Sequence, residues 1–227
     1  NWVAALDDIA PDVLLAQESL NPDEYQRPML KDDWIESVVW APTPVHWGSA
    51  VYVRALHPRP IEIPMPGFHG WVTGVELNDS PRTPTGRKVR FFSLHAPTGK
   101  EPYHKVVERI LVELRGFQDD CDLVIGGDFN LTVSERHESE ERKNKSVNLK
   151  IQEQLRKMGL INCWQTTHLN MPVAQTLRWD RDPKPAYHCD GIFVPESWAS
   201  RLISCEVLNS EMWVGMSDHN PVVAEFS

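Results

Sequence analysis

The stretch Cys121-Asp122-Leu123-Val124-Ile125-Gly126-Gly127-Asp128-Phe129-Asn130 decides how we interpret the rest of the chain. Its three apolar residues run directly into two glycines, which an acid, an aromatic ring and an amide follow. This pattern predicts a buried strand that ends in a tight, exposed turn. Ligand crevices in open α/β sheets lie at the carboxyl ends of strands, so Asp128 and Asn130 are candidate site residues. An Asx turn, in which Asp128 only caps the following backbone, explains the same residues equally well.

Two earlier strands are also predicted to end in a polar side chain. The apolar run Val13–Ala16 leads into Glu18, whose carboxylate is a hard oxygen ligand of the kind that suits Mg²⁺. The run Val89–Leu94 leads into His95, which opens a Pro-Gly turn. Each residue has a plainer interpretation, because Glu18 also fits a solvated loop and His95 also fits a hydrogen-bonded side chain that stiffens the turn.

The last part of the chain brings two acids and an imidazole to strand ends. The stretch Cys189-Asp190-Gly191-Ile192-Phe193-Val194-Pro195 predicts a strand that begins with an acid. The stretch Gly215-Met216-Ser217-Asp218-His219-Asn220-Pro221 precedes a final predicted strand at 222–226. An ordinary turn seldom needs an acid, an imidazole and a proline so close together. The candidates added here are Asp190, Asp218 and His219.

Helices and hairpins are predicted between these strands. Apolar residues recur at helical spacing over 106–114 and over 147–158, and Gly159 is placed to end the second helix. The strands predicted at 71–77 and 89–94 have no helix between them. They therefore predict a hairpin, and hence a mixed sheet in an α/β chain.

Two polar segments follow the central strand. The charged run 135–145 is almost free of large apolar residues and favours a solvated loop, although its basic side chains could also reach a phosphate backbone. Residues 162–187 look irregular and are rich in aromatic and charged groups. Bases stack on tryptophan and phosphates pair with arginine, which makes Arg178 and Trp179 candidate substrate-binding residues. Packing over a sheet edge is the alternative for both, and the interpretation that we favour for Trp164.

Composition bounds the class of protein. With 227 residues, 41% of them hydrophobic, the chain can bury one large core, and we predict a single domain over residues 1–227. The formal net charge of −9 excludes a surface-wide basic field for gripping nucleic acid, so a polyanion would be held by a local basic patch or through bound cations. No apolar run approaches the ~20 residues that a membrane span needs, which predicts a soluble chain. The four cysteines form no CxxC pair, so we predict buried free thiols.

Several of these motifs, taken in order, resemble those of the endonuclease/exonuclease/phosphatase family, the fold of pancreatic deoxyribonuclease and of apurinic/apyrimidinic endonucleases. The segment SLHAPTG is similar to the deoxyribonuclease-type version of that family, and the resemblance spans Asn1 to Ser227. It implies a four-layer α/β sandwich in which two packed mixed β-sheets are flanked by helices. The motifs are LLAQES with Glu18, GGDFN with Asp128 and Asn130, CDGIFV with Asp190, and SDHNPV with Asp218 and His219.

The resemblance implies roles for the metal and water ligands. Glu18 would bind the divalent metal, which we expect to be Mg²⁺, with Mn²⁺ as a substitute, and Asp218 would support the metal site. Asp128 and Asn130 would position and activate the attacking water.

The resemblance also implies an acid and base pair. Asp190 would orient His219, and His95 would be a second acid/base or phosphate-contacting group. Two departures from the family pattern stand out. The family's leading strand, which ends in an asparagine, does not precede Asn1, so we expect that strand to be missing from the chain. Gly191 follows Asp190 where the family often has an aromatic residue.

The sequence therefore predicts a Mg²⁺-dependent phosphodiesterase, a nuclease that hydrolyses DNA or RNA by in-line attack of water. We expect a monomer, with nucleic acid or another phosphodiester as its partner, no transmembrane segment and a cytoplasmic location. One alternative is a phosphatase or lipid phosphodiesterase of the same fold, acting on phosphoinositide or sphingomyelin head groups. The other is a catalytically weakened binding module.

Overall fold

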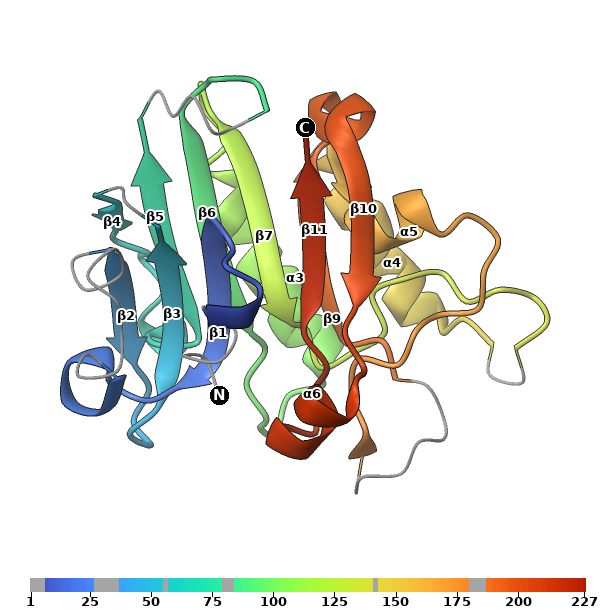
Figure 1. Cartoon of the computed structure of the whole chain (residues 1–227), viewed down its shortest axis with the longest axis horizontal. Coiled ribbons are helices and arrows are strands. Elements are labelled where there is room, and N and C mark those ends of the chain that lie inside the picture. Colours follow the sequence, from blue (N-terminus) through green and yellow to red (C-terminus); the bar gives the residue numbers. More distant parts are fainter. Residues whose placement is uncertain (1–6, 27–36, 55–56, 79–83, 141–142, 180–186) are drawn as a thin grey trace. The chain divides into compact units, whose positions relative to one another are not determined.

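The protein is described by a computed structural model, in which the chain forms two compact units. The described residues are 7–26, 37–54, 57–78, 84–140, 143–179 and 187–227. The first unit comprises Asn1–Pro97 and Asp119–Gly127, and the second comprises Thr98–Gln118 and Asp128–Ser227. The strand β7 (Asp122–Asp128) runs from the first unit into the second, with Asp128 as the first residue beyond the boundary (Figure 1).

The first unit begins with a three-stranded antiparallel sheet. Its strands are β1 (Val13–Ser19), β2 (Val38–Pro42) and β3 (Gly48–Val53), in the order β1-β3-β2 (Figure 1). All six residues of β3 are buried because this strand lies in the middle of the sheet. The predicted strand at Val13–Ala16 is confirmed, but it continues to Ser19 through a register shift between Ala16 and Ser19.

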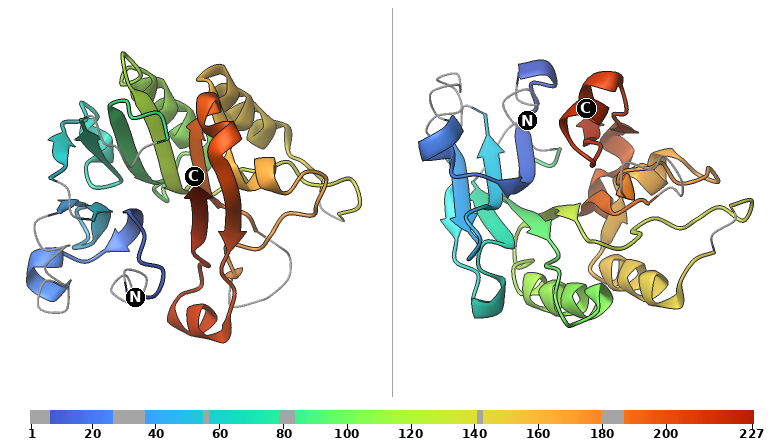
Figure 2. Two further views of the ribbon diagram at one scale, coloured as in Figure 1. Left: turned by 45° about the horizontal axis from the view of Figure 1, so that its top comes forward. Right: turned by 90° about the horizontal axis from the view of Figure 1, so that it is seen from below.

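A second set of strands in this unit follows the order β4-β5-β6-β7. These are β4 (Arg59–Ile61), β5 (Val72–Leu77), β6 (Val89–His95) and the part of β7 up to Gly127. Strands β5 and β6 form the predicted hairpin, in register from Val72 opposite Leu94 to Leu77 opposite Val89. They pack against β1, β2 and β3, as the views in Figure 2 show, so apolar side chains of both sheets share one core.

Gly127 allows the ends of three strands to approach closely. Its φ of +138° is one that side-chain-bearing residues rarely adopt, and a Cβ atom there would lie 2.0 Å from the Leu94 carbonyl oxygen and 2.8 Å from Nε2 of Gln17. The second glycine of the pair noticed in the sequence, Gly127, is therefore required by backbone contact as well as by backbone conformation.

Replacing Gly127 with alanine is expected to lower the free energy of unfolding by about 2–4 kcal/mol, because it combines an unfavourable φ with overpacking. Urea unfolding followed by circular dichroism measures this change. Gly99→Ala is the matched control, since a Cβ atom there meets nothing within 4 Å. Equal stability of the two variants would contradict the proposed packing.

The second unit contains two amphipathic helices and two strand pairs. The helices α3 (Tyr103–Arg115) and α4 (Ser146–Lys157) contact each other, and both match the predicted helices (Figure 2). Gly159, with φ of +69°, follows the end of α4 as predicted. Strand β8 (Leu160–Asn162) pairs with β9 (Asp190–Pro195), and β10 (Leu202–Val207) pairs with β11 (Val222–Phe226), all antiparallel (Figure 1).

Within 162–187, the described residues 162–179 are less irregular than predicted. The short helix α5 (Cys163–Thr167) begins there, because the Asn162 side chain accepts a hydrogen bond of 3.1 Å from the backbone N–H of Gln165. Trp164 on α5 is 2% exposed and stacks on His168, which confirms packing for this tryptophan. The remaining short helices are η1 (Pro22–Gln26), η3 (Pro66–Phe68), η5 (Glu196–Arg201) and α6 (Glu211–Met216).

The charged run 135–145 is not simply solvated. Arg136 and Glu140 form an ion pair of 2.6 Å, and their side chains are only 7% and 12% exposed. Glu140 also accepts the backbone N–H of Val173 at 3.2 Å and of His137 at 2.9 Å. The predicted solvated loop is confirmed for Glu135, Glu138, Lys143 and Lys145, which are exposed. It is wrong for Arg136 and Glu140, because this acid satisfies an arginine and two backbone donors.

All four cysteines are buried and free, as predicted. Burial raises the pKa of the Cys205 thiol to about 12, so this group behaves as a small apolar side chain. Among the helices of the described part of the chain, none has the length and hydropathy needed to cross a membrane.

Candidate active site

The second unit joins an imidazole to a carboxylate. The Nδ1–H of His219 donates to Oδ2 of Asp190 at 2.9 Å and lies 3.1 Å from Oδ1 of the same carboxylate. The His219 side chain is 31% exposed, whereas that of Asp190 is 13% exposed. The pair predicted from CDGIFV and SDHNPV therefore exists, and it leaves part of the imidazole at the surface.

Thr176 positions the acid of this pair. Its hydroxyl oxygen accepts the backbone N–H groups of Cys189 at 2.8 Å and of Asp190 at 3.1 Å. Its carbonyl oxygen accepts the backbone N–H of Asn220 at 2.7 Å. Since Thr176 is fully buried, it connects the start of β9 to the turn that carries His219 at a fixed distance.

Arg178 positions the imidazole of the pair. Its backbone N–H donates to the Asp218 carbonyl oxygen at 2.9 Å, and its guanidinium donates to the Asn220 side-chain oxygen and to the Ser217 carbonyl oxygen. Asn220 in turn donates to the Gln175 carbonyl oxygen at 2.9 Å. Arg178 is 6% exposed, so its side chain supports the turn from the protein interior. The predicted contact of Arg178 with a substrate phosphate stays a prediction.

Trp179 follows Arg178 directly and is 63% exposed. The Arg178 backbone is hydrogen-bonded to Asp218. The exposed indole of Trp179 is therefore an apolar surface group next to the turn that carries His219. Stacking of a substrate base on this ring remains a prediction.

Asp128 lies beside the Asp190–His219 pair and also forms the Asx turn considered in the sequence analysis. Its Oδ1 accepts the backbone N–H of Asn130 at 2.7 Å, and Asn130 has a φ of +53°. At the same time one ligand atom each of Asp128, Asp190 and His219 lie within 4.8 Å of one another. The Asx turn therefore presents the carboxylate to the imidazole, so that a capping role and a chemical role are compatible.

Charge in this cluster controls the protonation of His219. Burial by itself lowers the pKa of this imidazole, but the carboxylates of Asp190, Asp128 and Asp218 outweigh burial and raise the pKa to about 10. The imidazole is therefore a cation at neutral pH while these acids carry their charge. A protonated ring donates hydrogen bonds and cannot accept a proton.

The first unit holds the other two predicted residues, Glu18 and His95. Glu18 lies in the irregular part of β1 with a φ of +51° and an exposed side chain, a conformation that often marks functional positions. Its neighbour Gln17 donates to the Ser93 hydroxyl at 2.9 Å, and Ser93 donates to the Ala16 carbonyl oxygen at 2.9 Å. These bonds tie the end of β1 to β6, which ends in His95.

His95 is 5% exposed and packs in an aromatic cluster. Its ring stacks on Trp47 at 5.2 Å between centroids and meets Trp71 edge-on at the same distance. Its backbone N–H donates to the Trp71 carbonyl oxygen at 2.8 Å. The imidazole is thus fixed by two indoles, a surrounding that the sequence pattern did not predict.

Neither a protein-family model nor a curated protein matches the sequence. Solved structures do match. The 3′ phosphatase NExo from Neisseria, bound to a product DNA hairpin, has a TM-score of 0.74 at 21% identity, over 98% of this chain and 91% of that chain. An AP endonuclease from Archaeoglobus fulgidus has a TM-score of 0.75 at 19% identity, over 99% and 92%. The APE2 catalytic domain of Xenopus laevis has a TM-score of 0.72 at 12% identity, over 99% and 86%.

The chain has the DNase I-like fold. This likeness confirms the endonuclease/exonuclease/phosphatase-type α/β sandwich predicted from the sequence. At these identities the likeness concerns the DNase I-like fold alone, and the roles of individual residues have to be argued from this chain's own geometry.

Three further residues of this candidate site were missed in the sequence. Tyr103, at the start of α3, has its pKa raised by burial and then by the negative charge of Asp128 and Cys189. Asn220 is the amide residue of the Ser-Asp-His-Asn-Pro turn, and its position in that motif could have indicated a positioning role. Thr176 has no local signal, because only long-range bonds reveal it.

The donor set fits a divalent cation. Asp128 and Asp190 offer carboxylate oxygens within 4.8 Å of an imidazole nitrogen, and hard oxygen donors suit Mg²⁺ or Mn²⁺. Asp190 is already occupied by His219, so Asp128 is the carboxylate of this group better disposed toward a cation. The exposed carboxylate of Asp218 acts on the same imidazole electrostatically.

Proposed function

We propose that this chain is a metal-dependent phosphodiester hydrolase, and specifically a nuclease that cleaves DNA or RNA. The observation that carries the proposal is the His219 imidazole, held by Asp190 at 2.9 Å with the Asp128 carboxylate beside it. Structures of the same fold that are described as a 3′ phosphatase bound to product DNA and as AP endonucleases support a phosphoric ester of nucleic acid as the substrate.

His219 serves as the cation and hydrogen-bond donor of the proposed reaction. Cleavage of a phosphodiester adds negative charge to the non-bridging oxygens as the nucleophile arrives. An imidazolium with a pKa raised to about 10 can donate to such an oxygen throughout the neutral range. Asp190 fixes the tautomer and the direction of the ring, so that the nitrogen opposite Nδ1 faces the substrate.

Asp128 is the base of the proposed reaction. Its Oδ1 is oriented by the Asn130 backbone N–H at 2.7 Å, which fixes the plane of the carboxylate. A carboxylate in that position accepts the proton of the attacking water while Asn130 holds the water in line.

The proposal assigns Glu18 and Asp218 to the divalent cation. When bound, a Mg²⁺ or Mn²⁺ ion acts as a Lewis acid on a phosphoryl oxygen. Glu18 lies in the irregular part of β1 with a φ of +51°, and its exposed carboxylate is open to solvent, as a ligand requires. In a chain of net charge −9, the cation also reduces repulsion between the clustered acids and a phosphate.

Hydrolysis of an aryl phosphodiester with Mg²⁺, with EDTA, and with Mg²⁺ restored tests the proposal. We expect EDTA to reduce turnover by more than 10²-fold and Mg²⁺ to restore it, because the cation and the acids act as one unit. Isothermal titration of the metal-free protein with Mg²⁺ supplies the matching binding curve. Turnover that persists unchanged in EDTA would refute metal dependence, and binding of Mg²⁺ without any turnover would indicate a binding module.

Substrate class follows from a second set of assays. Single-stranded DNA, duplex DNA with an abasic site, RNA, 3′-phosphorylated DNA and a phosphoinositide head group are compared by kcat/KM under the same conditions. We expect DNA or RNA to exceed the head group by at least 10²-fold, since Trp179 offers a stacking surface for bases. Preference for the head group would favour the lipid phosphodiesterase alternative.

A further inference from the structure

His188 is a buried histidine that lies two residues before Asp190 in the second unit. Its side chain is fully buried, and its ring is tilted against Trp164 with 4.8 Å between centroids. Nδ1 of His188 lies 2.8 Å from the Ala174 carbonyl oxygen. Because a carbonyl oxygen can only accept, Nδ1 carries the proton of this hydrogen bond. Burial lowers the pKa of His188 to about 4, so the ring is neutral near pH 7 and Nε2 carries no proton.

The other ring nitrogen of His188 works against stability. Among the described residues, Nε2 of His188 has no hydrogen-bond partner, although it is buried. A buried polar atom without a partner is unfavourable for folding, and an apolar side chain of similar size would avoid that cost. Folding alone therefore does not account for an imidazole at this position. The group that an apolar side chain could not supply is the Nδ1–H that holds Ala174.

The backbone at His188 is bonded to the stretch that follows Asp128. The His188 carbonyl oxygen accepts the backbone N–H of Val133 at 3.0 Å, and the Cys189 carbonyl oxygen accepts that of Phe129 at 3.0 Å. Phe129 is the residue directly after Asp128. The residues that lead into β9 are therefore fixed on this side by the loop that carries the proposed base.

The His188 side chain reaches the segment on the other side. Ala174 lies two residues before Thr176, whose hydroxyl accepts the backbone N–H of Asp190 at 3.1 Å. The Thr176 carbonyl oxygen accepts the backbone N–H of Asn220 at 2.7 Å. By holding the Ala174 carbonyl group, His188 therefore sets the spacing between the strand that begins at Asp190 and the segment that carries Thr176.

We propose that His188 is a positioning residue for the Asp190–His219 pair. Its Nδ1–H holds Ala174, and through Ala174 it holds Thr176, at the spacing that aligns the Asp190 carboxylate with the imidazole of His219. The expected effect on turnover rests on the proposed function. The effect on the hydrogen bond between Asp190 and His219 can be measured in the resting protein.

Two substitutions of His188 separate positioning from stability. His188→Leu removes the donor but also removes the unpartnered nitrogen, so the melting temperature should stay within about 4 °C of the wild-type value. His188→Asn keeps an N–H close to the place of Nδ1 but leaves a void where the ring was, so it should lower the melting temperature further.

Turnover of the aryl phosphodiester should follow the opposite order. We expect kcat to fall by roughly 10- to 100-fold in His188→Leu, as the loss of a group that orients a site residue does. His188→Asn should keep kcat within about threefold of the wild-type value, and KM should change little in either variant, because His188 is buried away from the substrate. A purely structural histidine would instead make activity fall with stability.

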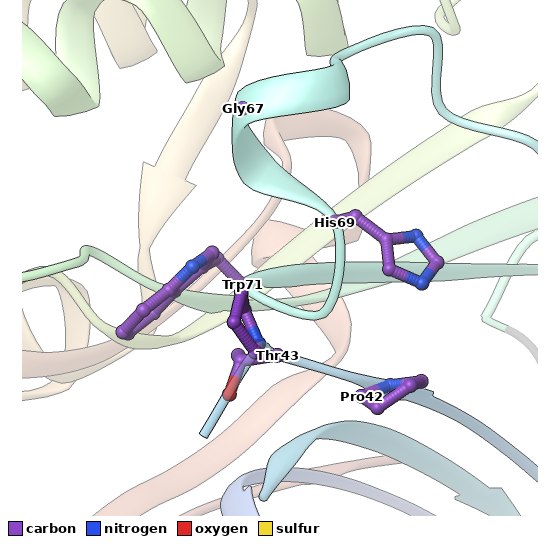
Figure 3. Close-up of a pocket in the computed structure, with 6 residues that line it drawn as sticks. Pro42, Thr43, Gly67, His69 and Trp71 are labelled. Atoms are coloured by element: carbon purple, nitrogen blue, oxygen red, sulfur yellow. The ribbon is translucent and has the colours of Figure 1, made fainter. Parts of the chain in front are cut away.

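Thr43→Val is the matched control. The Thr43 hydroxyl donates to the Trp47 carbonyl oxygen at 2.6 Å, and Thr43 is 5% exposed, so this substitution also removes one buried bond from a side chain to a carbonyl group. Thr43 belongs to the first unit, where it lines a cavity of about 300 Å³ (Figure 3). We expect Thr43→Val to keep the wild-type kcat.

Proton NMR of the full chain without metal follows the bond between Asp190 and His219 directly. A ring N–H that donates to a carboxylate resonates far downfield, and its absence in His219→Ala assigns the signal to His219. The wild-type chain, His188→Asn and Thr43→Val should keep this resonance, whereas His188→Leu should broaden it or move it upfield.

An unchanged His219 resonance in His188→Leu overturns the proposal, whatever happens to kcat. So does a His188→Asn variant that loses as much turnover as His188→Leu, since activity would then depend on the ring and not on the N–H. If the wild-type chain does not hydrolyse the diester, the proposed reaction fails, and the His219 resonance still decides whether His188 holds the pair.

Discussion

Replacing His219 with alanine is expected to lower kcat for phosphodiester cleavage by about 10²- to 10⁴-fold, with a much smaller change in KM. The imidazolium donates to the phosphoryl oxygen only as charge grows there, so its loss raises the barrier more than it weakens binding. Steady-state kinetics with the aryl phosphodiester and with DNA measure the effect. His57→Ala is the control, since it removes an exposed histidine of the first unit.

The protonation of His219 can be followed separately. In the metal-free protein the ring should titrate by NMR near its raised pKa of about 10, well above the unfolded value of 6.5. Because the pKa is raised in the folded state, this group contributes stability that is fully present below pH 6.5 and is lost as the pH rises through about 10. A ring that titrates near 6.5, or a His219→Ala variant with unchanged kcat, would contradict the role of an acid-held cation.

The change of Asp128 to asparagine should reduce kcat by a similar factor, about 10²- to 10⁴-fold, and leave the fold intact. In the wild-type chain the Asn130 N–H donates to Oδ1 of Asp128 at 2.7 Å. An asparagine at this position keeps an oxygen that can accept this hydrogen bond, but it cannot take a proton from water. The free energy of unfolding should therefore stay within about 0.5 kcal/mol of the wild-type value. Enzyme kinetics and urea unfolding on the same preparation provide both numbers.

This substitution distinguishes the two interpretations that the GGDFN stretch leaves open. If Asp128 only caps the turn, Asp128→Asn keeps full activity, whereas Asp128→Ala loses the cap and about 0.5–1.5 kcal/mol of stability. If Asp128 is the base, both variants lose turnover and only the alanine variant loses stability as well. Full activity of Asp128→Asn would remove the base from the proposed reaction.

Local patterns were sufficient to predict the strands and helices that carry the candidate site. Short apolar stretches next to Gly, Pro or acids predicted β6, β7, β9 and β11, because buried strands and their turns differ in composition over a short window. The pairing of Asp190 with His219 followed from family motifs rather than from spacing.

Long-range bonds limited what the sequence could predict. The alternation of charges over 135–145 gave no sign that Glu140 would bury Arg136 while accepting backbone donors of distant residues. Likewise the sequence did not show that the Arg178 guanidinium donates to the Ser217 carbonyl oxygen and to the Asn220 side chain, and the predicted substrate contact of Arg178 stays a prediction. Whether a long polar side chain faces solvent or a buried acceptor depends on partners far along the chain, which a local window does not contain.

The buried thiols can be used to measure local opening of the folded chain. Cys121 belongs to the first unit, whereas Cys163, Cys189 and Cys205 belong to the second. A maleimide in the solvent reaches a buried sulfur only after the surrounding segment has opened. The labelling rate of each cysteine, measured by mass spectrometry of the labelled peptides, therefore reports how often each unit opens. No engineered probe is needed, because the four native cysteines are the labelling sites.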